Sequence, residues 1–254
     1  MTDVLDEDLQ GRPVVSIDGA DVAQVRGLAH GDDEDDVLGL SLAKTGIFGG
    51  ELPEILPWPG IQGIGPDAVV VSSPATFVLP EDLSMNGDRP SPTAYTEQPP
   101  TPAAVAGTDG AFRFSQARAW PVVSATDGEA LGRVDRFVVD PATQRVSALR
   151  LDNVTGMQRY VSWRNITSFE PDAVTIRDAK ALRLGDGPRE EKVRRDYGML
   201  GKRVLTDAGH ELGKVTDVAF DPSDGSVTAV VLEDQAVAGD RLLGVGPYAV
   251  VVRH

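Results

Sequence analysis

Short apolar stretches, rich in valine, recur along the chain and are separated by glycine, proline and aspartate. This spacing is typical of short β-strands joined by tight turns, because a strand period of two residues needs few positions to build one buried face. Strands are predicted at 146–151, 159–163, 173–176 and 227–232. Each segment of about 60 to 70 residues then holds about five or six strands, and closing such a sheet into a small barrel leaves no open edge.

One pattern occurs three times. Residues 123–134 align with 204–215 at a shift of 81 positions, and residues 14–25 align with 123–134 at a shift of 109. A second matched block follows the first in each copy, at 58–71, 163–176 and 242–252. Two matched blocks in the same order predict three copies of one domain.

The residues that the copies share are those that hairpins and turns require. A valine-rich strand, an Asp-Gly or Ala-Gly turn and a strand closing on Leu-Gly-x-Val predict a β-hairpin. An Asp-Pro pair predicts the next turn, because Asp suits its first position and Pro fixes φ at the second. A tryptophan in the tails of the first two copies is expected to fill the barrel. The structural repeat positions are Gly19, Trp58, Pro66, Gly128, Gly132, Asp140, Pro141, Trp163, Pro171, Gly209, Gly213, Asp221, Pro222 and Pro247.

This tandem arrangement resembles the PRC-barrel family, named after the cytoplasmic barrel of the photosynthetic reaction-centre H subunit and including the C-terminal domain of a ribosome maturation factor. The resemblance covers about 190 of the 254 residues. It implies an all-β fold of three small PRC-type barrels that act as docking modules on larger assemblies. The sequence lacks a counterpart of the H subunit's transmembrane helix and of the ribosome factor's RNA-processing domain, so a reaction-centre or electron-transfer-associated role is a lesser alternative.

Changes in composition divide the chain into barrels and connecting segments. Prolines interleaved with Ser, Thr, Gly and Ala predict a semi-rigid linker without a fixed fold between the first two copies. The second junction is short and charged, so copies two and three are expected to pack as a pair, with the first tethered at a distance. The predicted divisions are an acidic extension (1–9), barrel 1 (10–79), a Pro-rich linker (80–114), barrel 2 (115–184), a charged linker (185–197) and a shortened barrel 3 (198–254).

Charge and cysteine content narrow the function classes. The formal net charge of -15 opposes binding to nucleic acid, and the absence of cysteine removes disulfides and thiolate metal sites. Residues 1–85 carry 16 acidic and 3 basic residues, so the acidity belongs to the first barrel. No signal peptide or transmembrane segment is predicted, and the expected location is cytoplasmic.

The most unusual stretch is the acidic run Asp32, Asp33, Glu34, Asp35 and Asp36. Its oxygens could loosely hold Mg²⁺ or Ca²⁺ or attract a basic protein surface. It lacks the spaced ligands and glycine of a calcium loop, so a solvated turn is the favoured interpretation.

His30 stands beside this run and is a weak candidate for a transition-metal ligand, since no second histidine has ligand spacing. The glycine-rich stretches 60–65 and 198–203 lack the spacing of phosphate loops and precede strands. No nucleophile elbow or paired acids occur. No catalytic residue, cofactor or tight metal site is therefore predicted.

The leading hypothesis is a non-catalytic adaptor or regulatory protein whose barrels dock on another protein, with the acidic first barrel steering toward a basic surface. Self-association through domains 2 and 3 is a further expectation. The alternative is an ion- or ligand-responsive sensor that uses the acidic first barrel, and an enzyme is the less favoured third interpretation.

Overall fold

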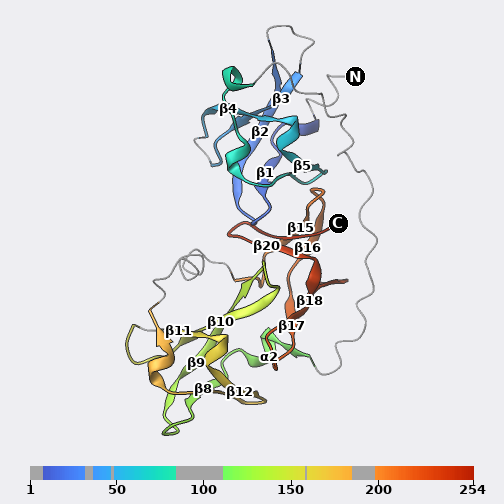
Figure 1. Ribbon diagram of the computed structural model, residues 1–254. Coiled ribbons are helices and arrows are strands. Elements are labelled where there is room, and N and C mark those ends of the chain that lie inside the picture. The colour runs from blue at the N-terminus through green and yellow to red at the C-terminus, as the bar shows by residue number, and fades with distance from the viewer. Residues whose placement is uncertain (1–7, 32–36, 47–48, 84–110, 158, 185–197) are drawn as a thin grey trace. The chain divides into compact units, whose positions relative to one another are not determined.

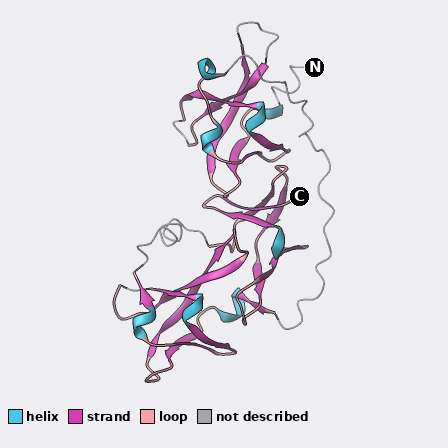
Figure 2. Ribbon diagram, in the orientation of Figure 1, coloured by secondary structure: helices cyan, strands magenta, loops and turns pink. Residues whose placement is uncertain are grey.

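The computed structural model describes residues 8–31, 37–46, 49–83, 111–157, 159–184 and 198–254. Within these ranges the protein is built of short strands, and its helices are single turns (Figure 2). This confirms the expected all-β class. The chain divides into two compact units: unit 1 holds 1–100, 204–212 and 248–254, and unit 2 holds 101–203 and 213–247. Both units include parts of the third copy, and Figure 1 labels the elements.

The first copy forms a six-stranded sheet with the order β4-β3-β2-β1-β6-β5. Its strands are β1 (Pro13–Ser16), β2 (Asp21–His30), β3 (Val37–Ala43), β4 (Glu51–Pro57), β5 (Ile61–Ile64) and β6 (Val69–Val71). Its 3-10 helices are η1 (Trp58–Gly60), η2 (Pro74–Thr76) and η3 (Pro80–Asp82). β1 pairs with β6 in parallel and the other neighbours pair antiparallel, so the two matched blocks of the sequence meet at this parallel pair.

The second copy repeats this plan in a seven-stranded sheet, β12-β13-β8-β9-β10-β11-β14. Its strands are β8 (Pro121–Ser124), β9 (Ala130–Asp140), β10 (Arg145–Asp152), β11 (Tyr160–Ser162), β12 (Ile166–Glu170), β13 (Ala173–Ile176) and β14 (Leu182–Arg183). Its 3-10 helices are η4 (Trp163–Asn165) and η5 (Ala179–Ala181). β8 and β13 form the parallel pair that corresponds to β1 and β6.

The third copy contributes to two four-stranded sheets, β16-β15-β21-β20 and β19-β18-β17-β7. Its strands are β15 (Arg203–Thr206), β16 (Glu211–Lys214), β17 (Asp217–Phe220), β18 (Val227–Val231), β19 (Ala236–Ala238), β20 (Leu242–Val245) and β21 (Ala249–Val252). Its 3-10 helix is η6 (Gly239–Arg241), which stands where the other copies carry tryptophan. β7 (Phe112–Arg113) and the helical turn α2 (Phe114–Ala117) precede the second copy in the chain.

Apolar side chains fill each sheet from one face. In the second copy Phe137, Leu149, Val161 and Leu182 stand opposite one another on four neighbouring strands, and all are buried. Such alternation puts one face of each strand in the core and leaves the other for polar residues. In the first copy the buried cluster consists of Leu9, Val14, Ala23, Val25, Leu40, Leu42, Leu56, Ile64, Val69 and Val71.

In each copy the first strand ends at a residue with a buried hydroxyl side chain. The backbone carbonyl of that residue closes the turn. The bonds are Gly19 N to Ser16 O (2.7 Å), Gly128 N to Ser124 O (2.9 Å) and Gly209 N to Thr206 O (2.9 Å). All three glycines have left-handed φ, which only glycine adopts readily. This confirms the predicted hairpins.

The ungapped alignment is wrong by one residue before this turn. Gly128 lies four positions after Ser124, whereas Gly209 lies three positions after Thr206. The second copy thus has an extra turn residue, and Val123 corresponds to Leu205 instead of Val204. A turn accepts an insertion at the surface without shifting the strands that it joins.

The Asp-Pro turns form as predicted. The Ala142 N–H donates to Asp140 Oδ1 (3.2 Å), and the Ser223 N–H donates to Asp221 Oδ1 (2.8 Å). In the first copy the corresponding residues, 32–36, lie outside the described residues.

The predicted linker, 80–114, differs from the structure at both ends. Residues 80–82 form η3, and residues 112–114 enter β7 and α2. Phe112 and Phe114 have a reason to be ordered, because each packs against other aromatic rings. The part of the linker at 84–110, like the charged linker at 185–197, lies outside the described residues.

Candidate functional site

Of the residues singled out as candidate metal ligands, His30 is the one that lies among the described residues. His30 is the exposed last residue of β2, and the acidic run that follows it lies outside the described residues. Across the described ranges, no group of three or more His, Cys, Asp or Glu side chains is placed to hold a metal ion. The ion-binding hypothesis therefore stays a prediction.

The glycine-rich stretch 60–65 has a packing role in unit 1. A Cβ atom on Gly63 or Gly65 would overlap the backbone of residues 207–209. The Asp67 and Ala68 N–H groups both donate to Gly209 O, each at 3.2 Å. Glycine thus permits a close backbone approach, and the first copy contacts a hairpin of the third instead of standing apart.

Aromatic side chains from four separate stretches of sequence form one cluster in unit 2. Phe114 and Phe137 are stacked with ring centroids 4.0 Å apart, and both are buried. Phe220, from the third copy, is fully buried and lies 5.3 Å from both Phe137 and Phe169 and 5.8 Å from Trp163. The remaining members are Phe112 and Trp120. Copies two and three therefore share one core, as expected of a packed pair.

The tryptophans differ in their surroundings. Trp58 donates its Nε1–H to Val37 O (3.1 Å) and packs against the first core, which fits the predicted filling role. Trp163 instead faces the third copy, where a Cβ on Gly225 would come within 2.9 Å of its indole.

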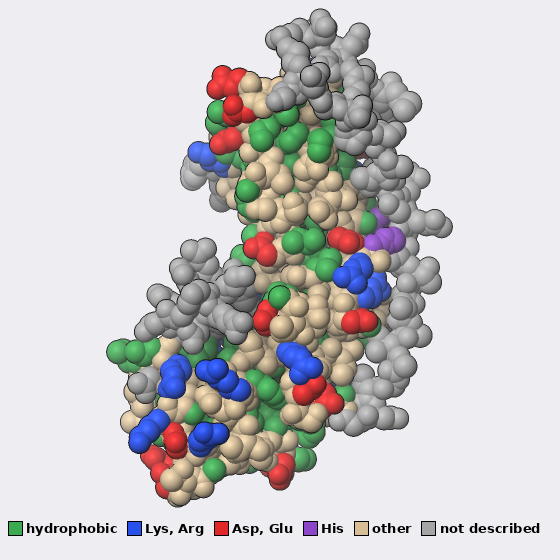
Figure 3. Space-filling view, in the orientation of Figure 1, with side chains coloured by type: hydrophobic (Ala, Val, Ile, Leu, Met, Phe, Trp, Pro, Cys, Tyr) green, Lys and Arg blue, Asp and Glu red, His purple; other side chains and the backbone are tan. Residues whose placement is uncertain are grey.

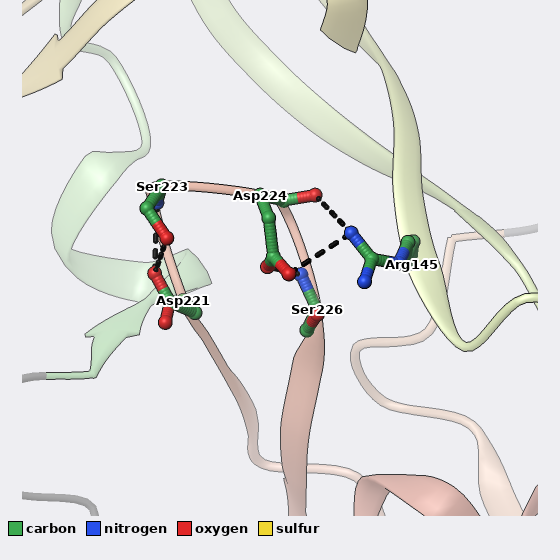
Figure 4. Close-up of polar contacts among 5 residues, drawn as sticks. All are labelled: Arg145, Asp221, Ser223, Asp224 and Ser226. Carbon is green, nitrogen blue, oxygen red and sulfur yellow. Dashed lines mark hydrogen bonds and ion pairs between the residues drawn. The ribbon is translucent and has the colours of Figure 1, made fainter.

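Main-chain bonds join copies two and three beside this cluster. The Val146 N–H donates to Gly225 O and the Val227 N–H donates to Gln144 O, both at 2.8 Å. Next to them Arg145 pairs with Asp224 (2.9 Å), which also accepts the Ser226 N–H at 2.8 Å (Figure 4). The Ser226 side chain, the Ser226 N–H and Arg145 hold the pKa of Asp224 below its ordinary value of 3.8.

This lowered pKa predicts a pH-dependent contribution to stability. A carboxyl whose pKa falls on folding stabilises the protein above its ordinary pKa, and this contribution is lost as the pH falls through the folded-state pKa. The variant Asp224→Asn should melt slightly below the wild type at pH 7, and the difference should shrink below about pH 4. Thermal melts at both pH values measure this; an equal difference at both would contradict it.

A buried carboxylate fixes α2 on the third copy. Asp217 accepts hydrogen bonds from the Ser115 N–H (3.1 Å), the Val218 N–H (2.8 Å) and the Ser115 hydroxyl. A buried charge is costly unless it is hydrogen-bonded in this way. The arrangement holds α2 beside β17 (Figure 1).

A cavity of about 430 Å³ opens next to α2 in unit 2. Its apolar wall includes the stacked rings of Phe114 and Phe137, and three cationic side chains and one carboxylate line it. The lining residues are Phe114, Arg118, Asp135, Arg136, Phe137, Gly198, Met199, Leu200, Gly201, Lys202 and Pro247. Residues 198–202 of the second glycine-rich stretch, 198–203, thus form part of the cavity wall.

The outer face of the second sheet carries a row of basic side chains that starts at this cavity. Arg136 lies opposite Arg150, Arg150 opposite Tyr160, and Tyr160 opposite Arg183, so the four share the face that the buried row does not use. We call these four residues the arginine row. Basic side chains gather over β9–β11 in Figure 3, with acidic and apolar ones among them.

One carboxylate is set into the arginine row. Asp135 is the bulged residue of β9, and its Oδ2 lies 2.9 Å from Arg150 Nη1 and 3.7 Å from Arg136 Nε. In the sequence these arginines stand at polar positions of strands in which polar and apolar residues alternate. The strand register is needed to place them side by side. The sequence alone therefore does not predict the arginine row.

These features define a protein of tandem small β-barrels, two of which share a core. The family model described as PRC-barrel domain matches residues 1–78, 109–183 and 191–253. The chain belongs to the PRC-barrel family and carries three tandem copies of its domain, which confirms the resemblance. A search of curated proteins found no match. In the described part of the chain, no helix is both long enough and apolar enough to cross a bilayer.

Proposed function

We propose that this protein is a non-catalytic adaptor or regulatory protein whose PRC-barrel domains dock on another protein or complex. Binding and adaptor roles are common among domains of this fold. The fold alone does not specify a function, so the proposal rests on how the polar groups of the described residues are used.

The observation that carries the proposal is the use of buried polar groups for folding. Among the described residues the buried polar side chains are Ser16, Ser124, Thr206, His210 and Asp217. The first three close the hairpin turns, the His210 N–H donates to Thr206 Oγ1 (3.2 Å), and Asp217 holds α2. Catalysis needs positioned acid, base or nucleophilic groups, whereas the buried side chains of Ser16, Ser124, Thr206 and Asp217 make hydrogen bonds that hold the hairpin turns and α2.

The joined second and third barrels support the same function. A docking module binds more tightly when its surface is held rigid before binding, since less conformational freedom is lost on association. The shared aromatic cluster provides such rigidity between the two copies. The acidic first barrel would add electrostatic steering toward a basic partner.

Chemical crosslinking of the full-length protein in native lysate, followed by mass spectrometry, tests the adaptor function. We expect stoichiometric crosslinks to one defined partner, and no substrate turnover by the purified protein. Turnover, or the absence of any stoichiometric partner, would contradict the proposal. Repeating the capture after Asp32, Asp33, Glu34, Asp35 and Asp36 are replaced by Asn or Gln measures the part played by the acidic run.

A further inference from the structure

We infer that the arginine row and the adjoining cavity form a docking site for an acidic, extended peptide segment of a partner protein. This inference rests on the proposed adaptor function and adds the surface and the chemistry of the partner. The expectation from the sequence is that the acidic first barrel meets a basic surface of a partner. This inference adds a basic surface on the second barrel that meets an acidic segment of a partner.

The first argument is the electrostatic cost of the row in isolation. Like charges directly opposite each other on neighbouring strands destabilise a sheet. Arg136 and Arg150 are such a pair, and Asp135 Oδ2 lies 3.7 and 2.9 Å from their side-chain nitrogens. Arg183 continues the same charge two strands further on. Carboxylates from a partner would lower this repulsion, so the surface is complementary to an acidic ligand.

The second argument is that the side chains remain accessible to a ligand. The side chains of Arg136 and Arg150 are 47% and 32% exposed, and Arg183 is also exposed. Tyr160 lies between Arg150 and Arg183 and offers a half-buried ring together with its hydroxyl. A planar guanidinium binds a carboxylate through two parallel hydrogen bonds, so several such contacts in a line favour a polyacidic chain over a single ion.

The cavity adds specificity at one end of the row. Arg136 belongs to both, and Arg118 and Lys202 line the cavity together with apolar residues, among them Phe114 and Leu200. A side chain that enters this space meets an apolar wall, three cationic side chains and the carboxylate of Asp135. The site therefore fits a segment in which acidic residues flank an apolar one.

Strand spacing sets the length of the segment. Neighbouring strands lie about 4.8 Å apart, so the row from β9 to β14 spans about 14 Å, and an extended chain covers this in about four or five residues. Nucleic acid is the less suitable polyanion, because the chain carries a net charge of -15 and Asp135 stands within the row. An acidic peptide of about this length is the ligand that the charge pattern and the cavity favour together.

The test uses the full-length protein and a fluorescein-labelled peptide of about ten residues, in which glutamate alternates with serine around a central leucine. We expect saturable binding that weakens steeply as salt rises from about 50 to about 300 mM. The double variant Arg136→Gln/Arg183→Gln should weaken binding about tenfold or more. Arg136→Lys/Arg183→Lys should retain part of it, because lysine keeps the charge but loses the bidentate geometry.

The matched control is Arg164→Gln/Arg177→Gln, which removes two exposed arginines of the same copy outside the row. It should leave the affinity within about twofold, and circular dichroism should show every variant folded at the temperature of the binding measurement. Equal weakening of peptide binding by Arg136→Gln/Arg183→Gln and by the control Arg164→Gln/Arg177→Gln would overturn the site. Tighter binding of a deoxythymidine decamer, or of vesicles rich in phosphatidylserine, than of the peptide would overturn the choice of ligand.

The failure of this inference can be told apart from failure of the adaptor function. If the protein captures a cellular partner whose binding is unchanged in Arg136→Gln/Arg183→Gln, the site is wrong while the adaptor function stands. If the protein proves to be an enzyme yet binds the acidic peptide through the row, the site stands and the adaptor function is wrong.

Discussion

Replacing Phe220 with alanine is expected to lower the free energy of unfolding of unit 2 by about 3 to 5 kcal/mol. The ring is fully buried and lies within 6.4 Å, centroid to centroid, of five other aromatic rings. Its removal loses hydrophobic burial and edge-to-face contacts at once and leaves a cavity between the two barrels.

Tryptophan fluorescence during denaturation in guanidinium measures this loss, because Trp163 lies 5.8 Å from Phe220. The control is Met157→Ala, whose side chain is 80% exposed and should change stability by less than about 0.5 kcal/mol. An effect of Phe220→Ala as small as that of the control would mean that copies two and three do not share a core.

Replacing Gly209 with alanine should also be strongly destabilising, for two reasons that a matched variant separates. Its φ of +83° strains any residue with a Cβ, and that Cβ would overlap the backbone of Ala68 and Gly65. Gly128 occupies the same turn position of the second copy with φ +73°, and nothing lies within 4 Å of its added Cβ. Gly128→Ala therefore reports the backbone strain alone, about 1 kcal/mol.

Gly209→Ala should lower the free energy of unfolding by this strain and by a further 1 to 3 kcal/mol or so for the overlap. Thermal melts of the two variants and of the wild type measure the difference. If both variants melt at the same temperature, the hairpin at 207–209 is not in close contact with the first copy. A larger loss for Gly128→Ala would contradict the comparison altogether.

Local patterns in the sequence predict most of the fold. The strands at 173–176 and 227–232 differ from the observed bounds by at most one residue, because alternation and flanking turns determine where short strands begin and end. The turns at Asp140 and Asp221 follow from side-chain hydrogen bonds within two residues. The repeat added the domain count, since the same local rules act three times.

Features that depend on distant residues could not be predicted in this way. Local sequence assigns Phe112 and Phe114 to a proline-rich linker. They are ordered because they pack against Phe220, about a hundred residues later in the chain. The arginine row depends on the register of four strands, and one residue of slip would put each arginine on the other face. Residues 116–185 carry 8 acidic and 10 basic residues, and this composition cannot show that Arg136, Arg150 and Arg183 share one face of the sheet.

The position of β7 has a consequence for how the two C-terminal domains unfold and evolve. Phe112–Arg113 precedes the second domain in the chain, yet it pairs with β17 and completes a sheet of the third. A third domain excised at residue 198 would expose the edge of β17, and open strand edges promote intermolecular pairing. Two domains that the family model matches separately should therefore unfold in a single cooperative transition and be inherited as one module.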